Sequence, residues 1–300
     1  MKIIAKLLRQ YRDLQDLTQM ELVNALIEYS DKFNGLNIVT LSRWETETTK
    51  PGLKKRQTLL KFLFSKGCFA NTTCRNMIKE RYGYLQEDLE KTFDRQFKHL
   101  IGNFPESDSF EYTIHTLKDH PEKALYFELI VEIEQASHPT DCLYNATPQI
   151  LEKWCEHPAS FAIVCESRRQ HAGHYILLKL KSSVADDIVH HQRSLFSITM
   201  DDFCDVEEKG TYLALTLFSR SGKVAALLNI EHYIHLIEQM NHIEKIVIFS
   251  RREDAVPMTK DYGIHLVASG TDEKEGYQWY GLSAPLEDIL FADTVVEAIY

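Results

Sequence analysis

The 300-residue sequence predicts a multidomain chain with an all-α N-terminal part, a helical linker and a C-terminal mixed α/β sheet domain. Three observations predict it. Apolar residues at helical spacing run through the first 100 residues. A polar stretch with two prolines, residues 102–122, then separates the two halves. After it, short segments of strand and helix length alternate to the end. We expect boundaries at 1–65, 66–122 and 123–300.

The composition is that of an ordinary soluble globular protein, with 44% hydrophobic and 26% charged residues. It excludes a disordered chain, a collagen-like repeat and a coiled-coil rod. No apolar run exceeds five residues, whereas a membrane-spanning helix needs about 20, and the N-terminus lacks a secretory signal. The six cysteines show no CxxC spacing, so we expect reduced thiols in a cytoplasmic protein without a membrane partner.

The net charge of −10 conceals an asymmetry between the two parts. Residues 1–100 hold 18 Lys and Arg against 12 Asp and Glu, a net +6, and residues 101–300 hold 16 against 32, a net −16. A basic front on an acidic rear suggests two different roles, with the basic part a candidate for binding a polyanion such as DNA. The alternative is that +6 over 100 residues is a modest, ordinary surface charge.

The first part predicts a sequence of short helices. Apolar spacing indicates a helix over 3–14. Thr18 and Glu21 form a capping box that starts a second helix, and Asn37 can cap a short third helix that runs through Trp44.

Two further helices follow. Pro51-Gly52 precedes an amphipathic run over 53–64, and residues 72–101 suit one long helix with a narrow apolar stripe from Ile78 to Leu100. The stripe either packs within the chain or forms a homodimer interface.

The first helices resemble a known DNA-binding family. LTQMEL at 17–22, TLSRWE at 40–45 and Pro51 are similar to the phage-repressor type (XRE) helix-turn-helix, and the resemblance covers residues 3–63. It implies a transcriptional regulator that binds a double-stranded DNA operator as a homodimer. One departure is an insertion of about eight residues, IEYSDKFN, before Gly35. Either the second helix is two turns longer, or the tight turn becomes a loop.

The resemblance also implies a set of DNA contacts. Gln19 would hold a phosphate, Thr40 and Arg43 would meet base edges or the backbone, and the lysines would meet phosphates. The full set is Gln19, Asn37, Ile38, Val39, Thr40, Arg43, Lys50, Lys54, Lys55 and Arg56. The alternative is a helical bundle that serves only as a protein-interaction module.

In the rear part, we expect alternating strands and helices around a long acidic connection over 182–210. The predicted strands cover 125–134, 161–166, 174–181, 212–218, 243–249, 264–268 and 277–282. The predicted helices cover 148–155, 224–240, 254–262 and 285–299.

This order resembles the GNAT family of N-acetyltransferases. The local signals are ILEKWCEHPASFAIVCE followed by GHYILLKL, then TYLALTLF, VAALLNIEHYIHLIEQM and DYGIHLVASG. The resemblance implies a coenzyme A pyrophosphate cradle at 219–228, but that loop keeps one glycine, Gly222. Thr259 stands where the family places its acid Tyr.

From these departures we expect no catalytic residue and no cofactor. We expect the C-terminal domain to sense a small-molecule effector or to dimerise. The alternative is an active acetyltransferase tethered by the helix-turn-helix. Candidate ligand-binding residues are Tyr212, Phe218, Arg220, Gly222, Lys223 and Tyr233.

A pair of histidines in the sequence is a candidate metal site. His232 and His235 are one helical turn apart, near Glu231, Glu238 and His242. A metal needs three or four convergent ligands, so we expect a solvated polar helix face and no metal.

Overall fold

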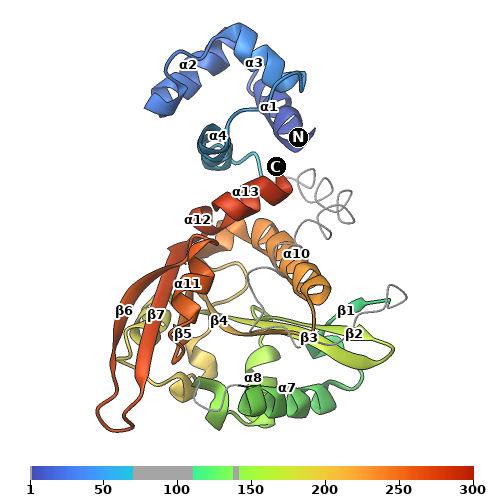
Figure 1. Cartoon of the computed structure of the whole chain (residues 1–300), viewed down its shortest axis with the longest axis vertical. Coiled ribbons are helices and arrows are strands. Elements are labelled where there is room, and N and C mark those ends of the chain that lie inside the picture. Colours follow the sequence, from blue (N-terminus) through green and yellow to red (C-terminus); the bar gives the residue numbers. More distant parts are fainter. Residues whose placement is uncertain (1, 70–110, 138–141) are drawn as a thin grey trace.

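The computed structural model describes residues 2–69, 111–137 and 142–300. They form a helical N-terminal part, here called the head, and a mixed α/β part built on a seven-stranded sheet (Figure 1). This agrees with the predicted class of all-α followed by α/β. The predicted helix over 72–101, with its stripe from Ile78 to Leu100, lies outside the described residues.

Four helices make up the head: α1 (Lys2–Leu14), α2 (Gln19–Tyr29), α3 (Ile38–Glu45) and α4 (Leu53–Ser65). The capping box at the start of α2 is present, since the Thr18 hydroxyl accepts the Glu21 N–H and the Glu21 carboxylate accepts the Thr18 N–H. Asn37 caps α3 by accepting the Thr40 N–H at 2.9 Å. These caps satisfy N–H groups that have no partner inside the helix.

The eight-residue insertion, residues 27–34, does not add two turns to α2: its first three residues complete the helix and the others form a turn. The helix ends at Tyr29, Ser30 is its C-cap, and Asp31–Phe33 form one 3₁₀ turn. Phe33 is fully buried, and Gly35 takes a φ of +80°, which favours glycine. The inserted residues therefore anchor the turn before α3 in the core of the head.

The sheet has the order β1-β2-β3-β4-β5-β7-β6. Its strands are β1 (Thr113–Thr116), β2 (Phe161–Ser167), β3 (Gln170–Leu180), β4 (Gly210–Ser219), β5 (Ile243–Ser250), β6 (His265–Thr271) and β7 (Gln278–Pro285). Strands β4 and β5 run parallel, while the other neighbouring pairs are antiparallel. The crossover between β4 and β5 is made by the long helix α10 (Gly222–Glu238).

Helices cover both faces of the sheet (Figure 1). One face carries α7 (Lys123–Ser137), α8 (Pro148–Cys155) and α9 (Ser182–Val189), which share a core with Ile176, Leu213 and Val247. The other face carries α10, α12 (Leu286–Leu290) and α13 (Asp293–Ile299), with the short α11 (Ala255–Lys260) nearby.

Three predictions about these helices are wrong. The predicted strand over 125–134 is helix α7, because Phe127, Ile130 and Glu134 are buried at helical spacing and the IVEIE alternation is too short to outweigh it. The acidic connection contains α9. The predicted last helix breaks at Phe291-Ala292 into α12 and α13.

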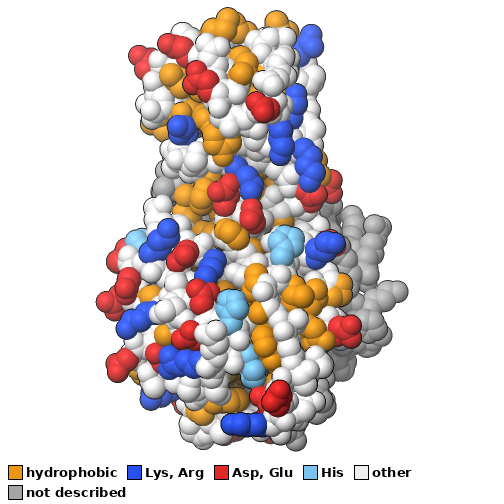
Figure 2. Space-filling model, turned by 90° about the vertical axis from the view of Figure 1, so that its left-hand side faces the viewer, with side chains coloured by type: hydrophobic (Ala, Val, Ile, Leu, Met, Phe, Trp, Pro, Cys, Tyr) orange, Lys and Arg blue, Asp and Glu red, His pale blue; other side chains and the backbone are white. Residues whose placement is uncertain are grey.

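The head packs on the end of the chain. Arg56 of α4 donates to the Val296 carbonyl at 3.3 Å, and Gln57 donates to the Phe291 carbonyl at 3.0 Å. The ring of Phe291 meets Phe64 at 5.6 Å and Phe69 at 5.4 Å between centroids. Opposite charges also meet where the head joins the α/β part (Figure 2). Some basic side chains of the N-terminal part therefore face the acidic C-terminal part of the same chain.

The described cysteines Cys68, Cys155, Cys165 and Cys204 are free thiols. Burial raises the pKa of the Cys68 thiol to about 11 and that of Cys165 to about 12, so these thiols stay protonated and unreactive at neutral pH. Among the described helices, none has the length and apolar character needed to cross a membrane.

Candidate functional site

The parallel pairing of strands β4 and β5 ends halfway along β4. Their parallel pairing runs from Gly210 opposite Ile243 to Ala214 opposite Ile248 and stops there. Strand β4 continues to Ser219, paired only with β3 on its other side in the described structure. On the side of β5, the β4 residues after Ala214 make no ladder hydrogen bonds with that strand, and we call this stretch the opening between β4 and β5. Backbone N–H and C=O groups without ladder partners are groups to which an extended ligand can add hydrogen bonds.

Helix α10 begins at the end of this opening. Ser221 is its N-cap, with the hydroxyl accepting the Val224 N–H at 3.3 Å. The first turn of a 17-residue helix carries partial positive charge and unpaired N–H groups. Arg220 and Lys223 stand on either side of Ser221-Gly222. A phosphate is the kind of group that such a helix start binds.

Close packing fixes the start of α10. A Cβ on Gly173 of β3 would come within 2.7 Å of both the Phe218 carbonyl oxygen and the Val224 side chain. Only glycine therefore lets the first turn of α10 lie this close to β3.

The six candidate ligand residues fall into two groups. Phe218, Arg220, Gly222 and Lys223 lie together where β4 ends and α10 begins. The other two, Tyr212 and Tyr233, do not face the opening.

Tyr212 is buried in the paired half of β4, where its hydroxyl contacts His235 Nε2 at 2.7 Å. Tyr233 points to the C-terminal helices, and its hydroxyl donates to the Leu290 carbonyl and contacts the Tyr300 hydroxyl. We therefore remove both from the ligand set.

Thr259, which the sequence resemblance aligns with the acid Tyr of the GNAT family, uses its hydroxyl locally. It donates to the carbonyls of Ala255 at 3.0 Å and Val256 at 3.4 Å within α11. Tyr262, three residues on, is half-buried with an enclosed hydroxyl, and desolvation raises the pKa of that hydroxyl.

The expectation that His232 and His235 lie on a solvated face is wrong. His232 is 8% exposed, and its ring lies 4.6 Å from that of Tyr175 between centroids. Burial lowers the pKa of His232 to about 3 and that of His235 to about 4, so both are neutral at pH 7. In the sequence, histidines interspersed with apolar residues suggest a helix with one polar face. In the structure, almost every face of α10 is covered.

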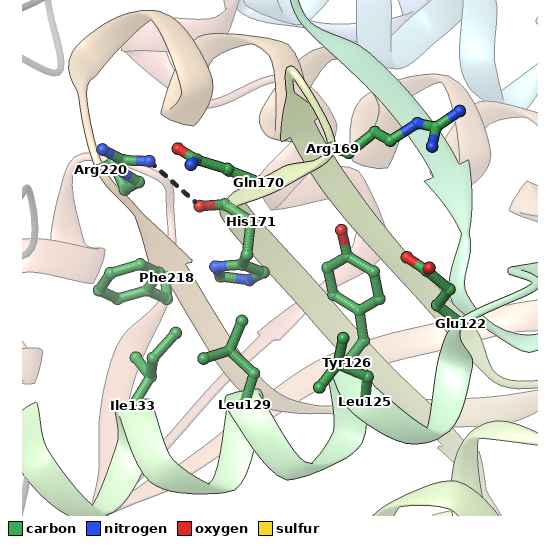
Figure 3. A pocket seen from close by; sticks show the side chains of 10 residues that line it. All are labelled: Glu122, Leu125, Tyr126, Leu129, Ile133, Arg169, Gln170, His171, Phe218 and Arg220. Atoms are coloured by element: carbon green, nitrogen blue, oxygen red, sulfur yellow. Dashed lines mark hydrogen bonds between the residues drawn. The ribbon is translucent and has the colours of Figure 1, made fainter.

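A pocket of about 410 Å³ lies on the opposite face of the sheet (Figure 3). We call it the α7 pocket. It is lined by Glu122, Leu125, Tyr126, Leu129, Ile133, Arg169, Gln170, His171, Phe218 and Arg220. The apolar residues come from α7 and the end of β4, and the two arginines come from the β2–β3 turn and the end of β4.

A buried polar chain ends at this pocket. Thr216 donates to the Glu134 carboxylate, His174 Nε2 contacts Thr216 Oγ1 at 3.3 Å, and His171 Nε2 contacts His174 Nδ1 at 3.0 Å. Because Thr216 donates to Glu134, its oxygen accepts from His174 Nε2–H. His174 Nδ1 then accepts from His171 Nε2–H. This assignment leaves Nδ1 of His171 as a hydrogen-bond acceptor.

A second cluster beside the pocket has the residue types of a metal site. His115, His120 and Glu166 place one ligand atom each within 4.8 Å of one another. However, His120 Nδ1 accepts the Glu122 N–H at 3.1 Å, so the proton is on Nε2, which contacts Glu166 at 2.9 Å. Tyr126 also donates to Glu166. A metal needs the Nε2 lone pair, so this pattern favours protons over a metal in the cluster.

In the head, α3 presents several of the predicted DNA contacts at the end far from the α/β part (Figure 1). Asn37, Ile38, Val39 and Arg43 are exposed, with Val39 60% exposed, and Thr40 is half-buried. Gln19, at the start of α2, donates to Glu45 at 2.6 Å. Lys50 is exposed and Lys55 half-buried.

Two predicted phosphate contacts are better explained as contacts of the head with the rest of the chain. Arg56 is 6% exposed, and its guanidinium lies against α13. Lys54 pairs with Asp293 at 3.1 Å. We therefore exclude both from the DNA-contact set, since α4 turns this side toward α13 and away from α3.

Comparison with known proteins gives only distant likenesses. No family model matches the sequence and no curated protein matches it. Solved structures with a similar C-terminal region include the ribosomal-protein-S18-alanine N-acetyltransferase from Escherichia coli (10% identity, 59% of this chain and 94% of that chain covered, TM-score 0.37). FeeM, an N-acyl amino acid synthase from uncultured soil microbes, has 12% identity, 59% and 92% coverage and a TM-score of 0.40.

A third similar structure is aminoglycoside 6'-acetyltransferase type Ii, with 8% identity, 59% and 97% coverage and a TM-score of 0.38. Likenesses of this size assign no activity to the chain.

Proposed function

We propose that the α/β part is a GNAT-type domain that binds a coenzyme A thioester in the opening between β4 and β5. The observation that carries this proposal is the end of β4–β5 pairing at Ala214, together with the start of α10 at the end of the same opening. The unpaired edge of β4 offers hydrogen bonds to an extended amide-bearing arm, and the helix start offers a phosphate site. A pantetheine arm joined to a pyrophosphate has this layout.

The charges at the helix start support an anionic ligand. Arg220 and Lys223 flank the N-terminal turn of α10, and the first acidic residue of that helix is Glu231, more than two turns away. The short loop with one glycine supplies fewer N–H groups than the family pattern. We therefore expect weaker pyrophosphate binding than in a family member with the full loop.

Whether the bound thioester reacts depends on an acid for the leaving thiolate. Thr259 does not serve, because its hydroxyl is bonded within α11. Acyl transfer to an amine is the activity that this fold class would support. We assign it no catalytic residue.

The test is calorimetric titration of the full chain with acetyl-coenzyme A, followed by assay of thiol release with a panel of amines. Saturable binding that Lys223→Glu weakens at least tenfold supports the proposal, and absence of binding to the parent protein overturns it. Lys209→Glu, at the opposite end of β4, is the matched control. Thiol release would make the domain a transferase, and binding without release would make it a sensor.

DNA binding by the head is a second candidate function. The observation that favours it is the exposure of α3, a short helix whose outward side chains are Ile38, Val39 and Arg43. The preceding helix α2 starts at a capping box beside it, the arrangement of a helix-turn-helix. A regulator of this type would couple ligand binding in the α/β part to operator affinity, and dimerisation would present two such heads.

Selection of genomic DNA fragments by the purified chain tests the second candidate. Recovery of one recurring sequence supports DNA recognition, and recovery of random fragments or none at low salt overturns it. Light scattering on the same sample tests the homodimer, because one head reads only one half-site.

A further inference from the structure

We propose that the α7 pocket binds a small monocarboxylic acid with an apolar body. The pocket lies on the α7 side of the sheet and shares Phe218 and Arg220 with the proposed coenzyme A site, whereas Arg169 and the apolar stripe of α7 belong to the pocket alone. The proposal comes from four properties of the lining: an apolar wall, a net charge of +1, a strained turn that carries one of the arginines, and a fixed neutral histidine.

The apolar wall has the shape of one helix stripe. Leu125, Leu129 and Ile133 follow one another at every fourth residue of α7, and Phe218 lies across from them (Figure 3). Leu125 is 58% exposed, although it stands on a helix whose other large apolar residues are buried or half-buried. An apolar body in the pocket would cover this stripe.

The charged lining side chains are Arg169, Arg220 and Glu122. Two guanidinium groups and one carboxylate leave a net charge of +1, which matches a monoanion better than a phosphate dianion. The planar guanidinium fork also fits a carboxylate with two parallel hydrogen bonds. One N–H of Arg220 is already directed to the His171 carbonyl at 3.4 Å, which holds that side chain at the pocket.

The β2–β3 turn places Arg169 at the mouth of the pocket despite a backbone cost. Arg168 and Arg169 have φ values of 53° and 61°, the left-handed conformation that two-residue hairpin turns reserve for Asn-Gly. Two arginines are poor residues for this turn. Such strain is typical of positions where the side chain has a role that the turn itself does not need.

His171 forms a rigid, uncharged part of the wall. Its imidazole lies between Phe218 and Tyr126 (Figure 3), stacked on Phe218 with a centroid distance of 5.8 Å. The chain through His174 and Thr216 to Glu134 fixes its orientation, and burial, followed by the charges of His174 and Arg220, lowers its pKa to about 3. The histidine therefore adds no charge near neutral pH and presents an acceptor to the ligand.

The test is calorimetric titration of the full chain with hexanoate and phenylacetate, beside hexanamide and phenylacetamide. We expect saturable binding of at least one carboxylate, no measurable binding of its amide, and at least a tenfold loss of affinity in Arg169→Gln, since a charge-assisted hydrogen bond is lost. Arg168→Gln is the matched control, because the neighbouring arginine is outside the lining, and it should bind like the parent. Leu129→Glu should abolish binding by placing a negative charge in the wall.

Three results would overturn the proposal: equal affinity for a carboxylate and its amide, equal affinity of Arg168→Gln and Arg169→Gln, or tighter binding of inorganic phosphate than of either carboxylate. Thermal unfolding of each variant without ligand shows that it is folded. Arg169 lies on the β2–β3 turn and is not among the residues at the start of α10, so loss of carboxylate binding in Arg169→Gln with acetyl-coenzyme A binding intact would separate the two sites.

Discussion

Lys61 of α4 donates a hydrogen bond to Asp288 of α12 at 2.7 Å, joining two helices 227 residues apart in the sequence. Glu287 lies 3.6 Å from the same ammonium group. Helix α12 in turn packs on α10, where Tyr233 donates to the Leu290 carbonyl. The head is therefore connected through α12 to the helix whose first turn borders the proposed ligand opening.

We expect this ion pair to make a small electrostatic contribution to the packing of the head on α12. Lys61→Glu should lower the free energy of unfolding by about 0.5–1 kcal/mol, because both partners are partly exposed and water screens them. Asp288→Lys should do the same, and the double variant should recover most of the loss. Urea denaturation of the four proteins closes the cycle. A double variant no better than the sum of the singles would mean that the pair contributes nothing to docking.

Gly173 offers a test of how α10 is positioned. Gly173→Ala places a methyl group 2.7 Å from the Phe218 carbonyl and the Val224 side chain, so we expect a loss of roughly 1–3 kcal/mol and a displaced helix start. Acetyl-coenzyme A affinity should fall more than stability alone explains. Gly52→Ala, where nothing lies within 4 Å, is the matched control in thermal unfolding. Unchanged stability of Gly173→Ala would contradict the close packing.

The sequence predicts local features better than it predicts where they meet. The capping box of Thr18 and Glu21 is legible because all its parts lie within four residues. The strand–helix–strand around α10 is legible because its three elements follow one another directly along the chain. In contrast, the sequence predicts a strand at Glu134, whose hydrogen-bond partner Thr216 is 82 residues away. No spacing rule predicts that these two residues meet. The same holds for α7 and His171.

One signal for the α7 pocket was present in the sequence. The hairpin SRRQ places two arginines in a turn that usually holds Asn-Gly, and a turn against its own preference is a hint of function. The sequence does not show which basic residues of the head are free for DNA and which contact the rest of the chain. Arg56 and Lys54 contact α13, which lies more than 200 residues later. DNA contact and contact with the head's own neighbour look alike in a sequence.

The buried histidines should make stability depend on pH. His171, His232 and His235 have folded pKa values of about 3, 3 and 4, below the ordinary value of 6.5. The unfolded chain thus binds more protons than the folded chain below pH 6.5. The contribution of these histidines to the free energy of unfolding is therefore fully present above pH 6.5 and is lost as the pH drops toward 4.

His232→Leu should reduce the pH slope of the free energy of unfolding by roughly 1.4 kcal/mol per pH unit between pH 6 and 4. His265→Gln, at an exposed position on β6, should leave the slope unchanged. Urea denaturation at pH 7, 6, 5 and 4 gives the slopes. An identical slope in the parent and His232→Leu would show that this histidine takes up a proton in the folded chain as readily as in the unfolded chain, and would contradict the lowered pKa.

If the head binds DNA, its contacts should divide into two kinds. Arg43, exposed on α3, should read base edges, so Arg43→Ala should cost roughly 1–3 kcal/mol on the selected sequence and little on random duplex. Lys50→Ala should weaken both alike and reduce the salt slope by about one unit, because it removes a phosphate contact. Lys54→Ala should change neither, since Lys54 pairs with Asp293 at the junction with α13. Fluorescence anisotropy on both duplexes at several salt concentrations measures all three. A salt slope that falls for Lys54→Ala and not for Lys50→Ala would place the DNA on the α13 side of the head and contradict the assignment of α3 as the reading helix.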